Sequence, residues 1–165
     1  MMRHADPPDG QPEVVVIPKE NAVFWLDADG RWRNEDGPFR HKRIIRHFHA
    51  SISRDADGYF VSQIRDGILE KVYFHYEDTA LFVVRVIAEN RRLLLELNTG
   101  GHIHMDPEKL FVDNDRLYLR NGADTVKFNQ RALFAVSEWI ETENDRLYIR
   151  DNGNRYVIRE DSVNR

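Results

Sequence analysis

The stretch that decides the fold is "NDRLYLRNGADTVKF" at residues 114–128, because the chain returns to it as "NDRLYIRDNGNRYVI" at residues 144–158. In the first copy, Leu117 and Leu119 alternate with polar residues, as the residues of a half-buried strand do. An Asn-Gly turn and a return strand then follow in both copies. The repeat therefore predicts a β-hairpin that is built twice. Two copies are too few for a solenoid, which needs about three repeats.

The segment between the copies, "NQRALFAVSEWIE", has the spacing of a helix rather than of a strand. Leu133, Phe134, Val136 and Trp139 fit one short helix, and Asn129 is well placed to cap its N-terminus. A short helix is therefore predicted between the two hairpins.

A second helix is predicted upstream, in "PFRHKRIIRHFHASI". Ile44, Ile45 and Phe48 fall on one stripe at helical spacing, and Pro38 suits a first turn. We expect this helix to cover residues 39–50.

The other apolar runs predict strands. "AVFWLDADGRWRN" reads as a hairpin around "DADG", a second "DADG" follows the first helix, and "ALFVVRVIA" with "RLLLELN" forms another hairpin. The two "DADG" segments resemble calcium loops only in part, because they lack the third ligand position and the distant bidentate glutamate. We interpret both as turns.

These elements predict an α+β protein, mainly antiparallel β with two short helices, in two packed β-rich halves. The connections are too short for repeated βαβ crossovers. We expect a flexible N-terminal arm at residues 1–12, an N-terminal α+β half at 13–76, and a C-terminal β-rich half with one helix at 77–165.

The composition of the chain excludes several classes of function. The chain has 165 residues, of which 41% are apolar and 32% charged, and its formal net charge is −4. An acidic balance argues against nucleic-acid binding by bulk electrostatics. With no cysteine, thiolate catalysis and cysteine-bound zinc are excluded. No apolar run is long enough to cross or anchor in a membrane, so we expect a cytoplasmic protein without a membrane partner.

One motif suggests metal binding. In "GGHIHMDPE", His102 and His104 would point to the same side of a strand, and Glu108 lies within reach. Two imidazoles and a carboxylate suit Fe(II), Mn(II) or Zn(II), as in part of the cupin metal motif. Exposed histidines in a turn region are the alternative interpretation, and it is the one we favour. We therefore expect no metal and no cofactor.

Other candidate sites are less specific. The predicted helix at 39–50 carries a basic face that includes Arg43, which would suit a phosphate or would simply be solvated. Glu77 and Asp78 form an adjacent pair of carboxylates that could act as acid and base, although such pairs are common in loops. No serine sits in a nucleophile elbow. The sequence thus favours a protein that is not an enzyme.

The order of these features resembles the bacterial family called domain of unknown function 1285, as a divergent member or a close neighbour of it. The likeness extends from about Gly30 to Ile158. It rests on "GRWRNEDGPFRHKRIIRHFHASISRDADGYFVS", "YFHYEDTALFVVRV", "LLLELNTG" and "FNQRALFAVSEWI".

The resemblance implies a duplicated domain whose C-terminal half is similar to a pleckstrin-homology barrel. It also implies a cleft between the halves that suits a nucleotide-like ligand, and a role in signal transduction. The positions carried over to this sequence are Arg43, Glu77, Asp78 and Arg131.

Together these observations predict a binding or regulatory protein that takes an anionic, nucleotide-like small ligand between its halves. One alternative is a metal-dependent cupin-like enzyme that uses His102, His104 and Glu108. Another is a protein–protein interaction module that acts through an edge strand or through exposed aromatic residues such as Trp25 and Trp32.

Overall fold

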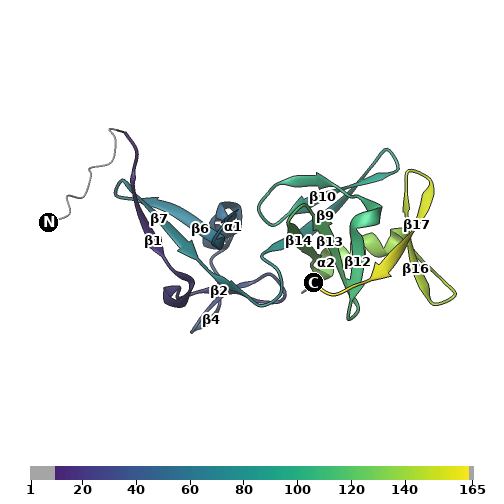
Figure 1. Cartoon of the computed structure of the whole chain (residues 1–165), viewed down its shortest axis with the longest axis horizontal. Helices are drawn as coiled ribbons and strands as arrows, with labels where there is room; N and C mark the ends of the chain where they lie inside the picture. Colours follow the sequence, from purple (N-terminus) through teal and green to yellow (C-terminus); the bar gives the residue numbers. More distant parts are fainter. Residues whose placement is uncertain (1–9, 164–165) are drawn as a thin grey trace.

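The computed structural model describes residues 10–163 and shows an elongated molecule with two lobes (Figure 1). The predicted arm at 1–12 lies largely outside the described residues. Strands β1 to β8 and helix α1 form the N-terminal half, and strands β9 to β17 with helix α2 form the C-terminal half. The halves are joined by residues 77–80. Among residues 10–163, no helix combines the length and the apolar character that a membrane span requires.

The N-terminal half contains the following elements: β1 (Glu13–Ile17), η1 (Lys19–Asn21), β2 (Trp25–Leu26), β3 (Trp32–Asn34), β4 (Gly37–Pro38), α1 (Lys42–Ser51), β5 (Ser53–Asp55), β6 (Gly58–Arg65), β7 (Ile68–Tyr73) and β8 (His75–Tyr76). They form two four-stranded sheets, with the orders β1-β7-β6-β5 and β4-β3-β2-β8. The pairs β1–β7 and β2–β8 are parallel, and the others are antiparallel.

The C-terminal half contains the following elements: β9 (Leu81–Glu89), β10 (Arg92–Leu97), β11 (His102–His104), η2 (Pro107–Lys109), β12 (Leu110–Asp113), β13 (Arg116–Asn121), β14 (Asp124–Phe128), α2 (Gln130–Val136), η3 (Ser137–Trp139), β15 (Ile140–Glu143), β16 (Arg146–Asp151) and β17 (Asn154–Glu160). Its nine strands form one sheet in the order β11-β10-β9-β14-β13-β12-β17-β16-β15. The sheet is open: its end strands β11 and β15 are not paired with each other. It therefore does not close into the barrel that the resemblance implies. The α+β class is confirmed.

Each copy of the repeated sequence forms a turn and the strand that follows it. Asn114 and Asp115 both have positive φ (48° and 63°), and so do Asn144 and Asp145 (51° and 62°). Two successive residues with positive φ are typical of the type I′ turn, whose twist matches that of a hairpin. The first copy thus forms the turn that leads into β13, and the second forms the turn that leads into β16. Strand β13 then pairs with its return strand β14, and β16 pairs with β17. The prediction of two hairpins flanking a short helix is confirmed.

Both predicted helices are present, with one correction. Helix α2 begins after Asn129, whose side chain accepts a hydrogen bond from the backbone N–H of Ala132 (2.8 Å), as the capping prediction requires. Helix α1, however, begins at Lys42 rather than at residue 39. Pro38 belongs to β4, because the backbone there is extended and pairs with Arg33.

The core of the N-terminal half is built around Trp32, which is 1% exposed. Trp32 is therefore not part of an exposed aromatic surface, contrary to the expectation for a protein–protein interaction module. Its ring meets those of Phe24, Phe48 and Phe74 edge to face, at centroid distances of 4.9 to 5.7 Å. Its indole N–H donates to Nδ1 of His49, 3.2 Å away. Burial lowers the pKa of His49 to about 4. His49 is therefore neutral at pH 7, with its proton on Nε2.

The two halves meet in a polar contact at Asp124 and in a close approach of Gly30 to Phe82. Tyr59 donates a hydrogen bond to the Asp124 carboxylate, which also pairs with Arg54 at 3.0 Å. Burial and then the neighbouring Asp124 raise the pKa of Tyr59. Gly30 lies against Phe82 so closely that a Cβ added to it would come within 3.1 Å of the ring. Its φ of +79° also favours glycine.

A buried lysine completes this junction. The Lys127 ammonium lies 2.9 Å from the Asp78 carboxylate and donates to the carbonyl oxygen of Ala28 at 2.5 Å. Only 8% of the Lys127 side chain and 12% of the Asp78 side chain are exposed. Tyr118 donates to the same Asp78 oxygen (2.7 Å), and the Glu77 carboxylate accepts from the Ala28 N–H (2.9 Å). Lys127 thus ties the C-terminal sheet to the linker and to the first "DADG" turn. We call Lys127, Asp78, Tyr118 and Ala28 the junction clamp.

The stability of the protein should depend on pH through His49. Above pH 6.5 the histidine is neutral in both states, whereas below that value the unfolded chain takes up a proton that the folded chain accepts only near pH 4. The free energy of unfolding should therefore fall by up to about 3 kcal/mol as the pH drops from 6.5 to 4. Urea titrations of the wild type and of His49→Gln, compared at each pH, isolate this contribution. Parallel curves for the two proteins would contradict it.

Replacing Lys127 by methionine should leave the Asp78 carboxylate without its buried cation, because the other cation near it, Arg116, lies 3.7 Å away and is 55% exposed. Breaking such a pair costs about 3 kcal/mol or more, measurable as a lower urea midpoint. Lys71→Met is the matched control, because the Lys71–Asp55 pair is more exposed and should contribute much less. Equal losses in the two variants would show that the clamp is not a buried interaction.

Candidate functional site

A groove follows the junction between the halves. Its central hollow measures about 300 Å³ and a neighbouring hollow about 480 Å³. The two share His49, Val84 and Asn98 in their walls, so we treat them as one site and call it the junction groove. The N-terminal half contributes the first "DADG" turn and helix α1, and the C-terminal half contributes β9, the end of β10 and the start of α2.

The "DADG" turn that forms one wall is built by Asp27, which is buried. One oxygen of its carboxylate accepts from the N–H groups of Asp29 (3.0 Å) and Arg31 (2.9 Å), and the other accepts from Nε of Arg33 (2.7 Å). Burial by itself would raise the pKa of Asp27, but these donors hold it below its usual value. The carboxylate is thus occupied inside the turn, as the turn interpretation expects, and Asp29, Gly30 and Arg31 face the groove.

The opposite wall is held by Asn98. Its side-chain oxygen accepts from the N–H of Phe82 (3.0 Å), and its side-chain nitrogen donates to the carbonyl oxygen of Ala80 (3.2 Å) and lies 3.5 Å from Nδ1 of His49. Phe82 and Val84 supply the apolar part of the lining. Because Trp32 already occupies Nδ1 of His49, the Nε2–H of this histidine is the group left to donate to a ligand.

The groove is basic. Four cations line it, namely Arg31, Lys42, Arg46 and Arg131, against two carboxylates, Asp29 and Glu96. Within residues 10–163, none of the four forms an ion pair, and Glu96 is engaged by Arg85 at 3.7 Å. A chain with a net charge of −4 thus places two of these cations at each hollow, Arg31 and Arg131 at the central one and Lys42 and Arg46 at the neighbouring one, against one carboxylate each, so the groove has an excess of positive charge. Such an arrangement attracts an anion and provides forked guanidinium donors to bind it.

The structure distributes the residues expected from the sequence over two places. Arg131 lines the junction groove. Arg43 lies on α1 but outside the helix residues that line the groove, which include Lys42 and Arg46. Glu77 and Asp78 lie beside the groove and are occupied by the first "DADG" turn and by the junction clamp. They support the site rather than face it.

The predicted metal ligands lie outside the lining of the groove, on and just after β11, the edge strand that pairs with β10. His102 and His104 are both exposed on β11, on the same face as predicted, and Glu108 is exposed in η2. The backbone N–H of Glu108 donates a hydrogen bond to the Asp106 carboxylate (3.0 Å). Across residues 10–163 there is no group of three or more His, Asp or Glu side chains placed to hold a metal ion.

Sequence reasoning missed Arg31 as a member of the site, and it treated Lys42, Arg46 and His49 only as part of the basic helix face from which Arg43 was selected. Lys42, Arg46 and His49 lie at positions i, i+4 and i+7 of α1, so they share one face, and that periodicity was the available signal. Arg31 had no such signal, because its placement depends on the turn that Asp27 builds.

The sequence and the fold can be compared with those of known proteins. No family model and no curated protein matches the sequence. Among solved structures, the crystal structure of a DUF1285 family protein from Silicibacter pomeroyi DSS-3 is similar, with a TM-score of 0.58 and 14% identity over 90% of this chain and 83% of that one. A DUF1285 family protein from Shewanella baltica OS155 has a TM-score of 0.49 and 18% identity, over 70% of this chain and 91% of that one. On the first of these similarities, the chain has the fold of a DUF1285 family protein.

Proposed function

We propose that the protein is a binding or regulatory protein that takes a small anionic ligand, nucleotide-like in size, in the junction groove. The observation that carries this proposal is the excess of positive charge in the junction groove, which four cations and two carboxylates line at the boundary between the two halves. Ligand sites form preferentially at such boundaries. The groove also lies within the volume range of small-ligand pockets.

The lining suggests how such a ligand would be held. Arg131 and Arg31 are placed for a phosphate group in the central hollow, and Lys42 and Arg46 for a second charge in the neighbouring one. Phe82 and Val84 offer apolar contact to a flat ring, and the Nε2–H of His49 offers a directional donor. The ligand would touch both halves, so its occupancy would change how firmly they are held together. This is the physical basis for a role in signal transduction.

Isothermal titration calorimetry with purine nucleoside monophosphates, diphosphates and inorganic phosphate tests the proposal. Arg131→Ala should weaken binding about tenfold or more, because a charge-assisted contact contributes about 1.5–3 kcal/mol. Arg46→Ala should weaken binding of the diphosphate more than of the monophosphate. Binding should also weaken as salt is raised.

Arg43→Ala is the matched control, since it removes the same side chain from the same helix outside the groove. It should leave the affinity unchanged, whereas a loss equal to that of Arg46→Ala would favour the face predicted from the sequence. Absence of binding by all of these anions, or unchanged affinity in Arg131→Ala, would overturn the proposal.

A further inference from the structure

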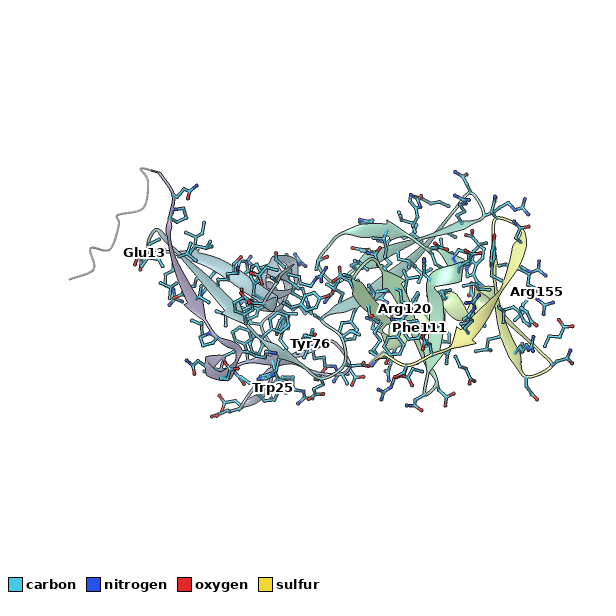
Figure 2. All side chains as sticks on the ribbon, in the orientation of Figure 1. Glu13, Trp25, Tyr76, Phe111, Arg120 and Arg155 are labelled. Carbon is cyan, nitrogen blue, oxygen red and sulfur yellow. The ribbon has the colours of Figure 1, made fainter. Side chains whose placement is uncertain are left out.

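Strand β1 combines an open sheet edge with three successive exposed valines. It lies at the outer edge of the N-terminal sheet, on the side away from the C-terminal half (Figure 1; Glu13 is labelled in Figure 2). Val14, Val15 and Val16 are 53%, 40% and 55% exposed. Successive residues of a strand point to opposite faces, so both faces of β1 are apolar and open to solvent. Its outer edge also carries backbone groups without a strand partner in the described chain.

Exposure continues from β1 across one face of the sheet. The pairing register puts Val14 beside Leu69 and Leu69 beside Ile64, which is 72% exposed. Val16 lies on the same face, beside Lys71. Single exposed apolar residues are ordinary, but a contiguous apolar patch on an open edge marks an interaction surface.

Apart from Glu13 at its first position, β1 has none of the features that protect edge strands from pairing. Edge strands are usually protected by charged side chains, bulges or an internal proline. The segment from Val14 to Ile17 has none of these, and it pairs with β7 in an unbroken register. Pro12 and Pro18 flank the strand and limit it to about five residues.

We propose that β1 pairs antiparallel with β1 of a second copy of this chain, about a two-fold axis at Val15. In that register Val14 faces Val16 of the other copy, so the sequence is its own complement. The two apolar patches become continuous, and the four-stranded sheets join into one of eight strands. In this register Glu13 faces Ile17 of the other copy at both rims, so no like charges meet across the interface.

The predicted dimer is weak. Five residues of edge pairing with the flanking patch bury less than the roughly 1,200 Å² of a stable interface. The expected behaviour is therefore a monomer–dimer equilibrium at micromolar or higher concentration. The junction groove lies in a different part of the molecule, so this proposal does not depend on the ligand.

Sedimentation velocity of the full chain over a concentration series tests the proposal. The wild type should move from the mass of one chain, 19.5 kDa, towards twice that value. Val15→Lys should stay monomeric, because it places two ammonium groups face to face at the axis. Val23→Lys is the control: Val23 is 76% exposed but lies outside β1, so this variant should associate like the wild type.

A mixture of Val15→Lys and Val15→Glu distinguishes this interface from any other. Each variant alone should be monomeric, and the mixture should form a heterodimer, because opposite charges then meet at the axis. Circular dichroism checks that both variants fold. A wild type that stays monomeric throughout, a Val15→Lys variant that still dimerises, or a mixture that does not associate would each overturn the proposal.

Discussion

The arrangement of the two halves depends on the interactions of the Lys127 ammonium with Asp78 and Ala28. This ammonium lies almost out of solvent between a carboxylate of the linker and a carbonyl oxygen of the N-terminal half, 99 residues away in sequence. A charge in this position is stabilised only if all its partners are in place. The clamp therefore selects one relative position of the halves. That position brings Gly30 against Phe82 and forms the groove above them.

The same contact explains why the first "DADG" turn belongs to the site. The Ala28 N–H is held by Glu77 and its carbonyl oxygen by Lys127, while the next three residues form a wall of the groove. A ligand that draws Arg31 towards Arg131 would pull on this turn and hence on the clamp. Under the proposed function, ligand binding and the fit between the halves would thus be linked through one short segment.

Much of the fold could be predicted because it is written in local patterns. The two Asn-Asp turns and the Asn152-Gly153 turn have positive φ at both central residues, and helix α2 carries its own cap at Asn129, so these hairpins and the helix follow from neighbouring residues. The first repeated hairpin instead turns at Gly122 and Ala123, one residue later than the predicted Asn-Gly turn, because Asn121 still pairs with Asp124. The start of α1 was misplaced because Pro38 suits both a first helical turn and an extended edge, and only the pairing with Arg33 decides between them. The parallel pairings β1–β7, β2–β8, β9–β14 and β12–β17 join distant segments and leave no local signal.

The site was predicted less well than the fold, for the same reason. Of the residues predicted from the sequence, Arg131 lines the junction groove, whereas Asp78 is paired with Lys127, which lies in a strand 49 residues further on. That either residue contacts a ligand stays a prediction. Lys127 itself reads in sequence as one polar residue of an alternating strand. Only tertiary structure shows that this position is buried.

The central claim is that the buried clamp holds the two halves in one position. The distance between spin labels on Asp36→Cys and Glu138→Cys, both at exposed positions on opposite halves, measures this directly by double electron–electron resonance in dilute protein. The chain has no cysteine of its own, so the labels are unambiguous. The account predicts a single narrow distance that broadens when Lys127→Met is added. A distribution already as broad in the protein that retains Lys127 would contradict it.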